Sequence, residues 1–209
     1  MKKLLFILLF TSITVVDFGQ TITYGIKGGL NLGQLSYGAM PFTHRYGAKF
    51  LVGFNAGGVI DIGFKDFSIQ PGIFYSIKGD KSSAQLTSER GTENITATAV
   101  LNYIEVPVNV FYKPVIAHDI HLSFGGGPYI GYGISQTLSL EAPYQNDPIT
   151  KSHHFSYKNP DWGVNIVAGI GFKKYIVDAG YELGLANLSS PYSGLRNRVI
   201  SLSVGYMFR

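Results

Sequence analysis

The amino-acid sequence predicts an all-β fold, an eight-stranded antiparallel up-and-down transmembrane β-barrel, and three observations support this prediction. Apolar residues recur with a period of two in eight segments, which is the pattern of strands with one apolar face. Long and short connections alternate between these segments, as in a barrel with large loops at one end and tight turns at the other. The apolar faces carry bulky side chains, whereas the opposite faces carry glycine, serine, asparagine and isolated charges.

The first four predicted strands set bulky apolar side chains on one face against small or polar ones on the other. Isoleucine, valine and aromatic residues are favourable in strands, so composition and periodicity agree. The apolar faces are Ile22, Tyr24, Ile26, Leu30 and Leu32 in residues 21–32; Phe50, Val52, Phe54 and Ile60 in residues 50–61; Phe67, Ile69, Ile73, Tyr75 and Ile77 in residues 67–78; and Ile104, Val106, Val108, Val110 and Tyr112 in residues 102–113.

The last four predicted strands show the same alternation, with glycine, serine, asparagine and acidic residues on the second face. The apolar faces are Ile120, Leu122, Phe124, Ile130 and Tyr132 in residues 120–132; Trp162, Val164, Ile166, Ala168, Ile170 and Phe172 in residues 161–172; Tyr175, Val177, Ala179, Tyr181, Leu183 and Leu185 in residues 175–185; and Ile200, Leu202, Val204, Tyr206 and Phe208 in residues 200–208.

The fourth segment, NYIEVPVNVFYK, carries a glutamate and a proline within a strand pattern. Both Glu105 and Pro107 fall on the face opposite the valines, so they do not interrupt the apolar face. Proline has no backbone N–H to donate to a ladder, and a closed barrel has no edge where that absence is harmless. We therefore expect a local bulge or a missing ladder bond at Pro107.

The size of the apolar side chains decides which face meets the barrel interior. Eight strands enclose only enough space for side chains, and eight faces of bulky residues would overfill it. We therefore expect the apolar faces to meet lipid and the polar faces to line the lumen, rather than the reverse arrangement of a soluble lipocalin-like barrel. The predicted lumen network is Lys27, Asn55, Glu105, Asn109, Asn165, Asp178 and Glu182, and the predicted interfacial aromatics are Tyr24, Phe50, Tyr112, Trp162, Tyr206 and Phe208.

The connections predict an orientation in the membrane. Residues 63–66, 114–119 and 173–174 form tight joins, whereas residues 79–96 and 135–160 form long polar ones. With both ends of the barrel in the periplasm, the tight turns are periplasmic and the loops around residues 37–45, 80–92, 139–158 and 189–196 face outside. The ending VGYMFR looks like the aromatic-ended final strand that barrel-assembly machinery recognises, although Arg209 follows the phenylalanine.

The first nineteen residues have the pattern of a secretory signal peptide. Lys2 and Lys3 precede an apolar run that is too short to span a membrane, and a short polar region follows. A buried N-terminal helix is the alternative. We expect cleavage near Gly19 or Gln20, which leaves residues 20–209 as an outer-membrane β-barrel domain and places the protein in the cell outer membrane.

The composition excludes several classes of function. The net charge is +4, but no run of lysine or arginine exceeds two residues, so nucleic-acid binding is not expected. The absence of cysteine excludes disulfides, thiolate metal sites and cysteine nucleophiles. We expect no cofactor and no metal site, because adjacent His153 and His154 project to opposite sides of an extended chain.

Several short motifs resemble one known family. The segment LNYIEVPVNVFYK resembles the Y-x-E-x-P strand of the Bacteroidota outer-membrane β-barrel domain, the PorT-like or "porin family" proteins. The segments PGIFYSIKGDK, GGGPYIGYGI and YELGLANLS are similar to later strands of that family. The resemblance covers the mature chain and implies the fold. It also raises an envelope or secretion-system protein as a partner, because PorT is associated with type IX secretion.

The polar residues leave three functions open. A structural or interaction role through the external loops is our main prediction, with outer-membrane lipids and barrel-assembly machinery as partners and no catalytic residue. A narrow passive pore would use the charged lumen. A barrel-embedded lipid hydrolase would need His121, Ser123 and Glu105, but two side chains that are two residues apart on a strand lie ~7 Å from each other, too far for a base to reach the nucleophile.

Overall fold

The computed structural model of the chain describes residues 20–37, 48–88, 91–144, 147–154, 159–188 and 194–208. The predicted signal peptide at residues 1–19 lies outside the described residues. Within the described ranges, no helix is long and apolar enough to cross a membrane.

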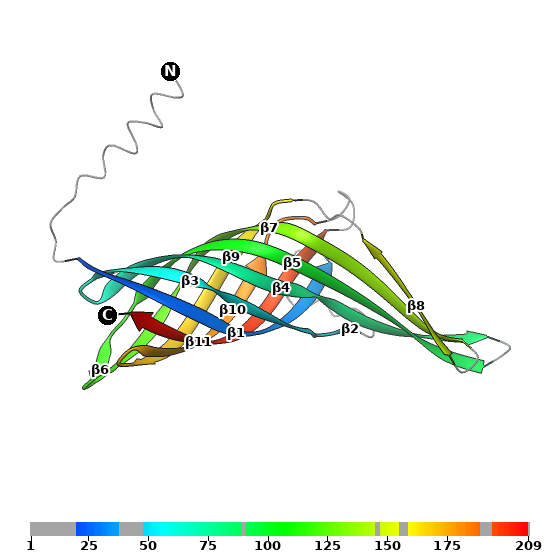
Figure 1. The fold of residues 1–209 in the computed structure, drawn as a ribbon, viewed down its shortest axis with the longest axis horizontal. Coiled ribbons are helices and arrows are strands. Elements are labelled where there is room, and N and C mark those ends of the chain that lie inside the picture. The colour runs from blue at the N-terminus through cyan, green and yellow to red at the C-terminus, as the bar shows by residue number, and fades with distance from the viewer. Residues whose placement is uncertain are drawn as a thin grey trace, which may run out of the picture.

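Eight strands pair in a closed antiparallel ring, which confirms the predicted fold (Figure 1). Strands that follow one another along the chain are neighbours in the ring, and the last strand pairs with the first, from Tyr24–Phe208 to Tyr37–Leu195. In ring order, the strands are β1 (Thr21–Tyr37), β3 (Leu51–Phe64), β4 (Phe67–Ser88), β5 (Gly91–Tyr112), β7 (Ile120–Tyr144), β9 (Asp161–Phe172), β10 (Tyr175–Gly184) and β11 (Leu195–Phe208).

Three short strands flank the ring. They are β2 (Ala48–Lys49), which pairs with β4, and β6 (Val115–Ala117) and β8 (Asp147–His154), which both pair with β7. Two connections that the sequence analysis treated as long polar loops are therefore largely strand. Residues 79–88 belong to β4 and residues 91–96 to β5, and much of 135–160 belongs to β7 and β8. Periodicity missed them because serine and threonine there provide no apolar face to alternate, although threonine is favourable in strands.

The barrel is apolar outside and polar inside. On the outer face, Ile166 is 68% exposed and Val204 is 63% exposed, whereas Lys78 and Asp161 on the inner face are fully buried. A water-soluble protein would bury such isoleucines and expose such charges. The exposure pattern is that of a barrel whose outer surface is solvated by lipid.

The predicted interfacial aromatics lie on this outer face. Tyr206 is less exposed than the other five, because its ring packs against those of Tyr175 and Phe208, whose centroids are 5.4 and 5.3 Å away. The ladder pairs Tyr24 with Phe208 and Tyr112 with Phe67, so aromatic residues gather near the tight-turn end. The exposed members of the predicted set are Tyr24, Phe50, Tyr112, Trp162 and Phe208.

The tight turns all lie at one end of the barrel, together with the start of β1 and the end of β11 (Figure 1). Lys65, Asp119 and Lys173 occupy the left-handed backbone region, with φ of 56°, 63° and 54°. Positive φ at a central position gives a two-residue turn the twist of the flanking strands, so these residues close the hairpins tightly. We call this the turn end, and the opposite end the long-strand end.

The ladder between β4 and β5 is interrupted at Pro107, as predicted. Pairs run up to Pro71–Val108 and resume at Phe74–Glu105, so Pro107 has no ladder partner on β4. The register does not shift across this gap, so the irregularity is a missing pair and not a bulge. A register shift occurs instead at Asn102–Tyr103, in the ladder with β7.

Trp162 provides a test of the inside-out arrangement, because it is the only tryptophan of the chain and its side chain is 50% exposed on the outer face. Tryptophan prefers the membrane–water interface. We expect its fluorescence in lipid vesicles to be blue-shifted, and to be quenched more by lipids brominated near the headgroup than by lipids brominated at the chain end. A water-exposed spectrum that brominated lipids do not quench would contradict the assignment of this face to lipid.

Candidate functional site

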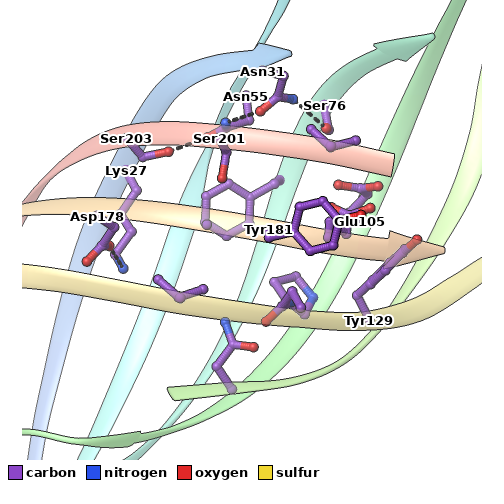
Figure 2. Close-up of a pocket in the computed structure, with 18 of the residues that line it drawn as sticks. Lys27, Asn31, Asn55, Ser76, Glu105, Tyr129, Asp178, Tyr181, Ser201 and Ser203 are labelled. Atoms are coloured by element: carbon purple, nitrogen blue, oxygen red, sulfur yellow. Dashed lines mark hydrogen bonds and ion pairs between the residues drawn. The ribbon is translucent and has the colours of Figure 1, made fainter. Parts of the chain in front are cut away.

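The predicted lumen residues converge on one interior cavity. All seven of them line a cavity of about 120 Å³, which lies between strands on opposite sides of the ring. Figure 2 shows four of these side chains, Lys27, Asn55, Glu105 and Asp178, which extend into the lumen from β1, β3, β5 and β10. The period-two pattern places them there, because each occupies the face opposite the lipid-facing residues of its strand.

Direct contacts join these side chains in pairs and chains. Lys27 Nζ on β1 lies 2.6 Å from Asp178 Oδ2 on β10. Asn55 Nδ2 donates to Asn31 Oδ1 over 2.7 Å, and Asn31 Nδ2 donates in turn to Ser76 Oγ over 3.1 Å. These contacts tie β3, β1 and β4 together from the inside, so part of the network braces neighbouring strands (Figure 2).

Lys78 is the centre of the charged network. Its ammonium forms ion pairs with Glu105 on β5 and with Glu182 on β10. It also lies 4.6 Å from the ring centroid of Tyr129 and 5.5 Å from that of Tyr103, which adds cation–π attraction. Because β4 and β10 lie on opposite sides of the eight-strand ring, the Lys78–Glu182 contact crosses the lumen.

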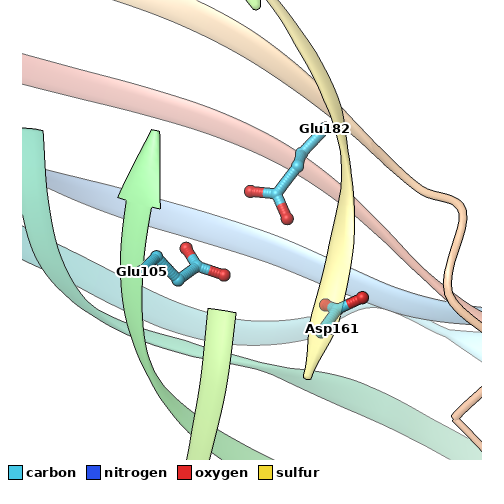
Figure 3. A group of neighbouring side chains, drawn as sticks. All are labelled: Glu105, Asp161 and Glu182. Atoms are coloured by element: carbon cyan, nitrogen blue, oxygen red, sulfur yellow. The ribbon is translucent and has the colours of Figure 1, made fainter. Parts of the chain in front are cut away.

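A third carboxylate completes this cluster. Carboxylate oxygens of Glu105, Asp161 and Glu182 lie within 4.8 Å of one another (Figure 3). Asp161 Oδ2 accepts a hydrogen bond from Asn197 Nδ2 over 2.7 Å. Oxygen ligands of this kind suit Ca²⁺ or Mg²⁺, but the Lys78 ammonium already lies between two of the three carboxylates. The arrangement is that of a cross-linked plug of buried charges.

The sequence analysis missed part of this cluster. It placed Glu105 and Glu182 in the lumen, but it did not name Lys78 or Asp161 among the lumen residues. Asp161 is the first residue of β9 and of the predicted strand. Alternation on one side of it alone was weak evidence for the direction of its side chain. The aromatic partners Tyr103 and Tyr129 share the inward parity of Glu105 and Gly131, and this parity was the available signal.

Apolar side chains enclose the polar chamber on both sides. Toward the turn end, Val59, Ile176 and Met207 form a small buried cluster against which Phe74 packs. Toward the long-strand end, a larger cluster consists of Leu35, Ala99, Leu101, Tyr103, Ala186, Leu188 and Leu195. The lumen is thus filled in layers, an apolar layer, a charged layer and a second apolar layer, as expected for a small barrel packed with side chains.

A separate ion pair lies nearer the turn end. Lys113 Nζ, just after β5, is 2.6 Å from Asp61 Oδ1, and Gln70 Nε2 donates to the same oxygen over 2.9 Å. Burial lowers the pKa of the Lys113 ammonium, and the neighbouring Asp61 carboxylate opposes that shift. Sequence parity alone gave no reason to join these two residues.

The residues required by the hydrolase alternative are not brought together. Glu105 pairs with Gly131 of β7 and lies in the Lys78 cluster, whereas Ser123 lies eight residues earlier on β7. Eight residues of strand span about 27 Å. Ser123 is buried, with 3% of its surface exposed, and His121 lines the opening at the turn end. His153 and His154, expected in a loop, belong to strand β8, where the His153 side chain is exposed.

Comparison with known proteins finds one matching family model and several matching solved structures. A family model described as "Outer membrane protein beta-barrel domain" matches residues 18–190. Among curated proteins, none matches this sequence.

Three solved structures with a similar fold have low sequence identity. Ail, the attachment invasion locus protein of Yersinia pestis, solved in complex with the heparin analogue sucrose octasulfate, is 15% identical over 90% of this chain and 99% of that chain, with a TM-score of 0.41. Neisserial surface protein A is 10% identical over 90% and 99%, with a TM-score of 0.46. OprG from Pseudomonas aeruginosa is 12% identical over 91% and 97%, with a TM-score of 0.39.

Proposed function

The chain belongs to the outer membrane protein beta-barrel domain family and resides in the outer membrane, and from this premise we propose that it is a membrane scaffold that binds a protein partner through a projecting sheet. The observation that carries the proposal is the length of β4, β5 and β7. The β1–β3 ladder ends at Gly33–Leu51, but β4 and β5 remain paired as far as Ser88–Gly91.

The projecting sheet has four strands in the order β4, β5, β7 and β8, and it extends from the long-strand end (Figure 1). From Asp80–Ala99 to Ser88–Gly91, the β4–β5 ladder extends about 27 Å at the rise of a strand. A structure that only had to close the barrel would not need this length. Loops and extensions on a rigid scaffold are where binding functions are usually found.

Both edges of the projecting sheet are open. Within the described residues, β8 pairs only with β7, and β4 beyond Ser82 pairs only with β5. An open edge presents unpaired backbone N–H and C=O groups, which a partner can satisfy by adding an extended strand. Exposed Lys151 and Ser152 on β8 would provide side-chain contacts beside that backbone pairing.

The finer assignments rest on the sequence: the family type on the motif resemblance, the signal peptide on its residue pattern and the orientation on the lengths of the connections. We infer that the chain is of the PorT-like, Bacteroidota type, that residues 1–19 are a cleaved signal peptide, and that the projecting sheet faces outside while the tight turns face the periplasm. We infer barrel-assembly machinery as a partner during biogenesis and an envelope or secretion-system protein as the functional partner. The separation of Ser123 from Glu105 weakens the hydrolase alternative, and the charged contacts across the lumen weaken the pore alternative.

Site-specific cross-linking tests the partner proposal, and the absence of cysteine makes every introduced cysteine unique. A photoreactive probe on Ser152→Cys should give one discrete protein adduct in cells, whereas Val115→Cys on β6 at the turn end should not give that adduct. Replacing residues 147–154 by a glycine–serine linker should abolish the corresponding complex on native gels while the barrel remains folded by heat-modifiable gel mobility. A complex that persists without β8 would refute binding at this edge.

A further inference from the structure

Three prolines interrupt the wall of the barrel beside the interior cavity, which we call the chamber. Pro71, Pro107 and Pro128 lie on the neighbouring strands β4, β5 and β7. Proline has no backbone N–H, so it cannot donate the ladder bond that its position in a strand requires. Because the ring is closed, none of these strands is an edge of the barrel, and each missing donor leaves a neighbouring carbonyl group without its ladder partner.

Each proline coincides with a gap in one ladder. Pairing between β3 and β4 stops at Val59–Gly72 and resumes at Ile62–Ile69, so Pro71 has no partner among the described residues of β3. The gap at Pro107 in the β4–β5 ladder was described above. Pro128 likewise has no ladder partner in the described part of β5. The three gaps therefore fall on three successive ladders, on one side of the ring.

The chamber adjoins all three gaps. It is lined by Gln70 at the first gap, Pro107 at the second and Asn109 at the third. At the third gap, a side chain on Gly127 would collide with the Val108 carbonyl oxygen, so this oxygen lies against the lumen side of Gly127. Backbone groups at the gaps therefore lie beside an interior cavity and not only against lipid.

Two amides that line the chamber also lack partners. The side-chain oxygens of Asn109 and Asn165 are buried and accept no hydrogen bond from the part of the chain that the structure describes. Only 8% of Asn109 is exposed. Asn165 pairs with Gly127 from β9, and Asn109 lies beside the same glycine on β5. Acceptor oxygens without donors therefore gather around one cavity.

The size and the chemistry of the chamber fit water. A volume of about 120 Å³ holds about four water molecules, because one water occupies about 30 Å³ in the liquid. Hydroxyl groups of Ser76, Ser201 and Ser203 line the chamber together with the amides, so a water there meets the polar partners that it needs. The apolar clusters toward the turn end and the long-strand end separate this space from bulk water.

We propose that the chamber binds a cluster of about four ordered water molecules, which donate hydrogen bonds to Asn109 and Asn165 and to the carbonyl groups left unpaired at the three prolines. These waters take the place of ladder bonds that proline cannot make, within a bilayer whose hydrocarbon offers no other donor. The site does not involve the projecting sheet, so it is independent of the partner proposed above.

X-ray radiolysis of the full refolded chain in detergent micelles tests this inference, because hydroxyl radicals formed from a bound water oxidise the side chains beside it. Tyr129 lines the chamber and is 4% exposed, whereas Tyr103 belongs to the apolar cluster toward the long-strand end and is fully buried. Mass spectrometry should therefore find Tyr129 oxidised faster than Tyr103 at the same dose. Oxidation of Tyr129 that does not exceed that of Tyr103 would overturn the proposal.

Brief mixing with heavy-oxygen water before the X-ray pulse separates bound water from bulk water. Tyr129 should still gain light oxygen, because the apolar clusters slow the exchange of the chamber waters. His153, which is exposed on β8, should gain heavy oxygen at once. Immediate uptake of heavy oxygen by both residues would show free exchange with bulk water and would overturn an ordered cluster.

A double variant tests the role of the two amides. Asn109→Leu/Asn165→Leu replaces them by apolar side chains of similar shape, and should lower the oxidation of Tyr129 to the rate of Tyr103. Asn94→Leu makes the same change at an exposed position of β5 and should leave the oxidation of Tyr129 unchanged. Heat-modifiable gel mobility identifies the folded fraction of each variant. Undiminished oxidation of Tyr129 in the folded double variant would contradict binding of the waters by these amides.

Discussion

Lys78→Met should lower the free energy of unfolding of the barrel by about 3–5 kcal/mol. The substitution removes the cation that neutralises Glu105 and Glu182 and leaves Asp161 close to both, so two buried carboxylates and one half-buried carboxylate face one another without a counter-charge. Removing one partner of a buried ion pair costs more than the pair contributes, because the remaining charge cannot return to water. Urea titration of the refolded protein, followed by Trp162 fluorescence, measures the change.

Two variants separate this effect from a loss of surface charge. Lys151→Met removes an exposed lysine of β8 and should change the free energy of unfolding by less than about 0.5 kcal/mol. Lys78→Met combined with Glu105→Gln and Glu182→Gln should recover part of the loss, because it removes the repulsion between carboxylates. If Lys78→Met is as stable as the unmodified chain, the charged plug does not stabilise the barrel.

Ile166→Arg should destabilise the barrel in lipid by about 2–4 kcal/mol, the cost of a cation at the bilayer midplane. Ile166 is the most exposed of the large hydrophobic residues of β9, and it lies between Trp162 and Phe172, the aromatic residues toward the two ends of the strand. The arginine would have to extend its side chain to an interface or carry water into the hydrocarbon. Unfolding in vesicles of a fluid phospholipid, compared with the unmodified protein, measures this cost.

A matched substitution at the membrane boundary separates the effect of depth in the bilayer from the effect of replacing isoleucine by arginine. Ile116 on β6 has a similar side chain and is 56% exposed at the turn end. Arginine near an interface costs only about 0–1 kcal/mol, so Ile116→Arg should be close to neutral. Equal destabilisation by the two substitutions would contradict the placement of Ile166 in the hydrocarbon and of Ile116 near the interface.

The membrane-facing half of the fold could be predicted because lipid imposes a strict pattern. Ile104, Val106 and Val108 alternate with Glu105 and Pro107 since one face must be apolar for the full depth of the membrane. This requirement for an apolar face applies only to the part of each strand that lies within the membrane. Beyond Gly79 on β4, Ser82, Ser83 and Thr87 carry no periodic apolar signal although the strand continues to Ser88.

The sequence predicted which residues face the lumen, but it did not predict which of them contact one another. Parity placed Lys27 and Asp178 inside the barrel, yet their contact joins β1 and β10, which are not neighbours in the ring. Lys78 on β4 and Glu182 on β10 also meet across the lumen, although their strands are not neighbours. Such contacts depend on the tilt and stagger of the strands around the axis, and these quantities follow from closure of the whole ring and not from any one segment.

The ladder between β1 and β11 closes the barrel, and we expect it to form last in folding. Every other ladder of the ring joins strands that follow one another, whereas Tyr24 and Phe208 pair across nearly the whole chain. Loop-closure entropy and long sequence separation both slow such a contact. Until this ladder forms, the chain is an open sheet whose edge strands β1 and β11 have unpaired backbone N–H and C=O groups in lipid. Species of this kind pair with the wrong neighbour or aggregate. We therefore expect the pairing of β1 with β11 to limit the rate of folding.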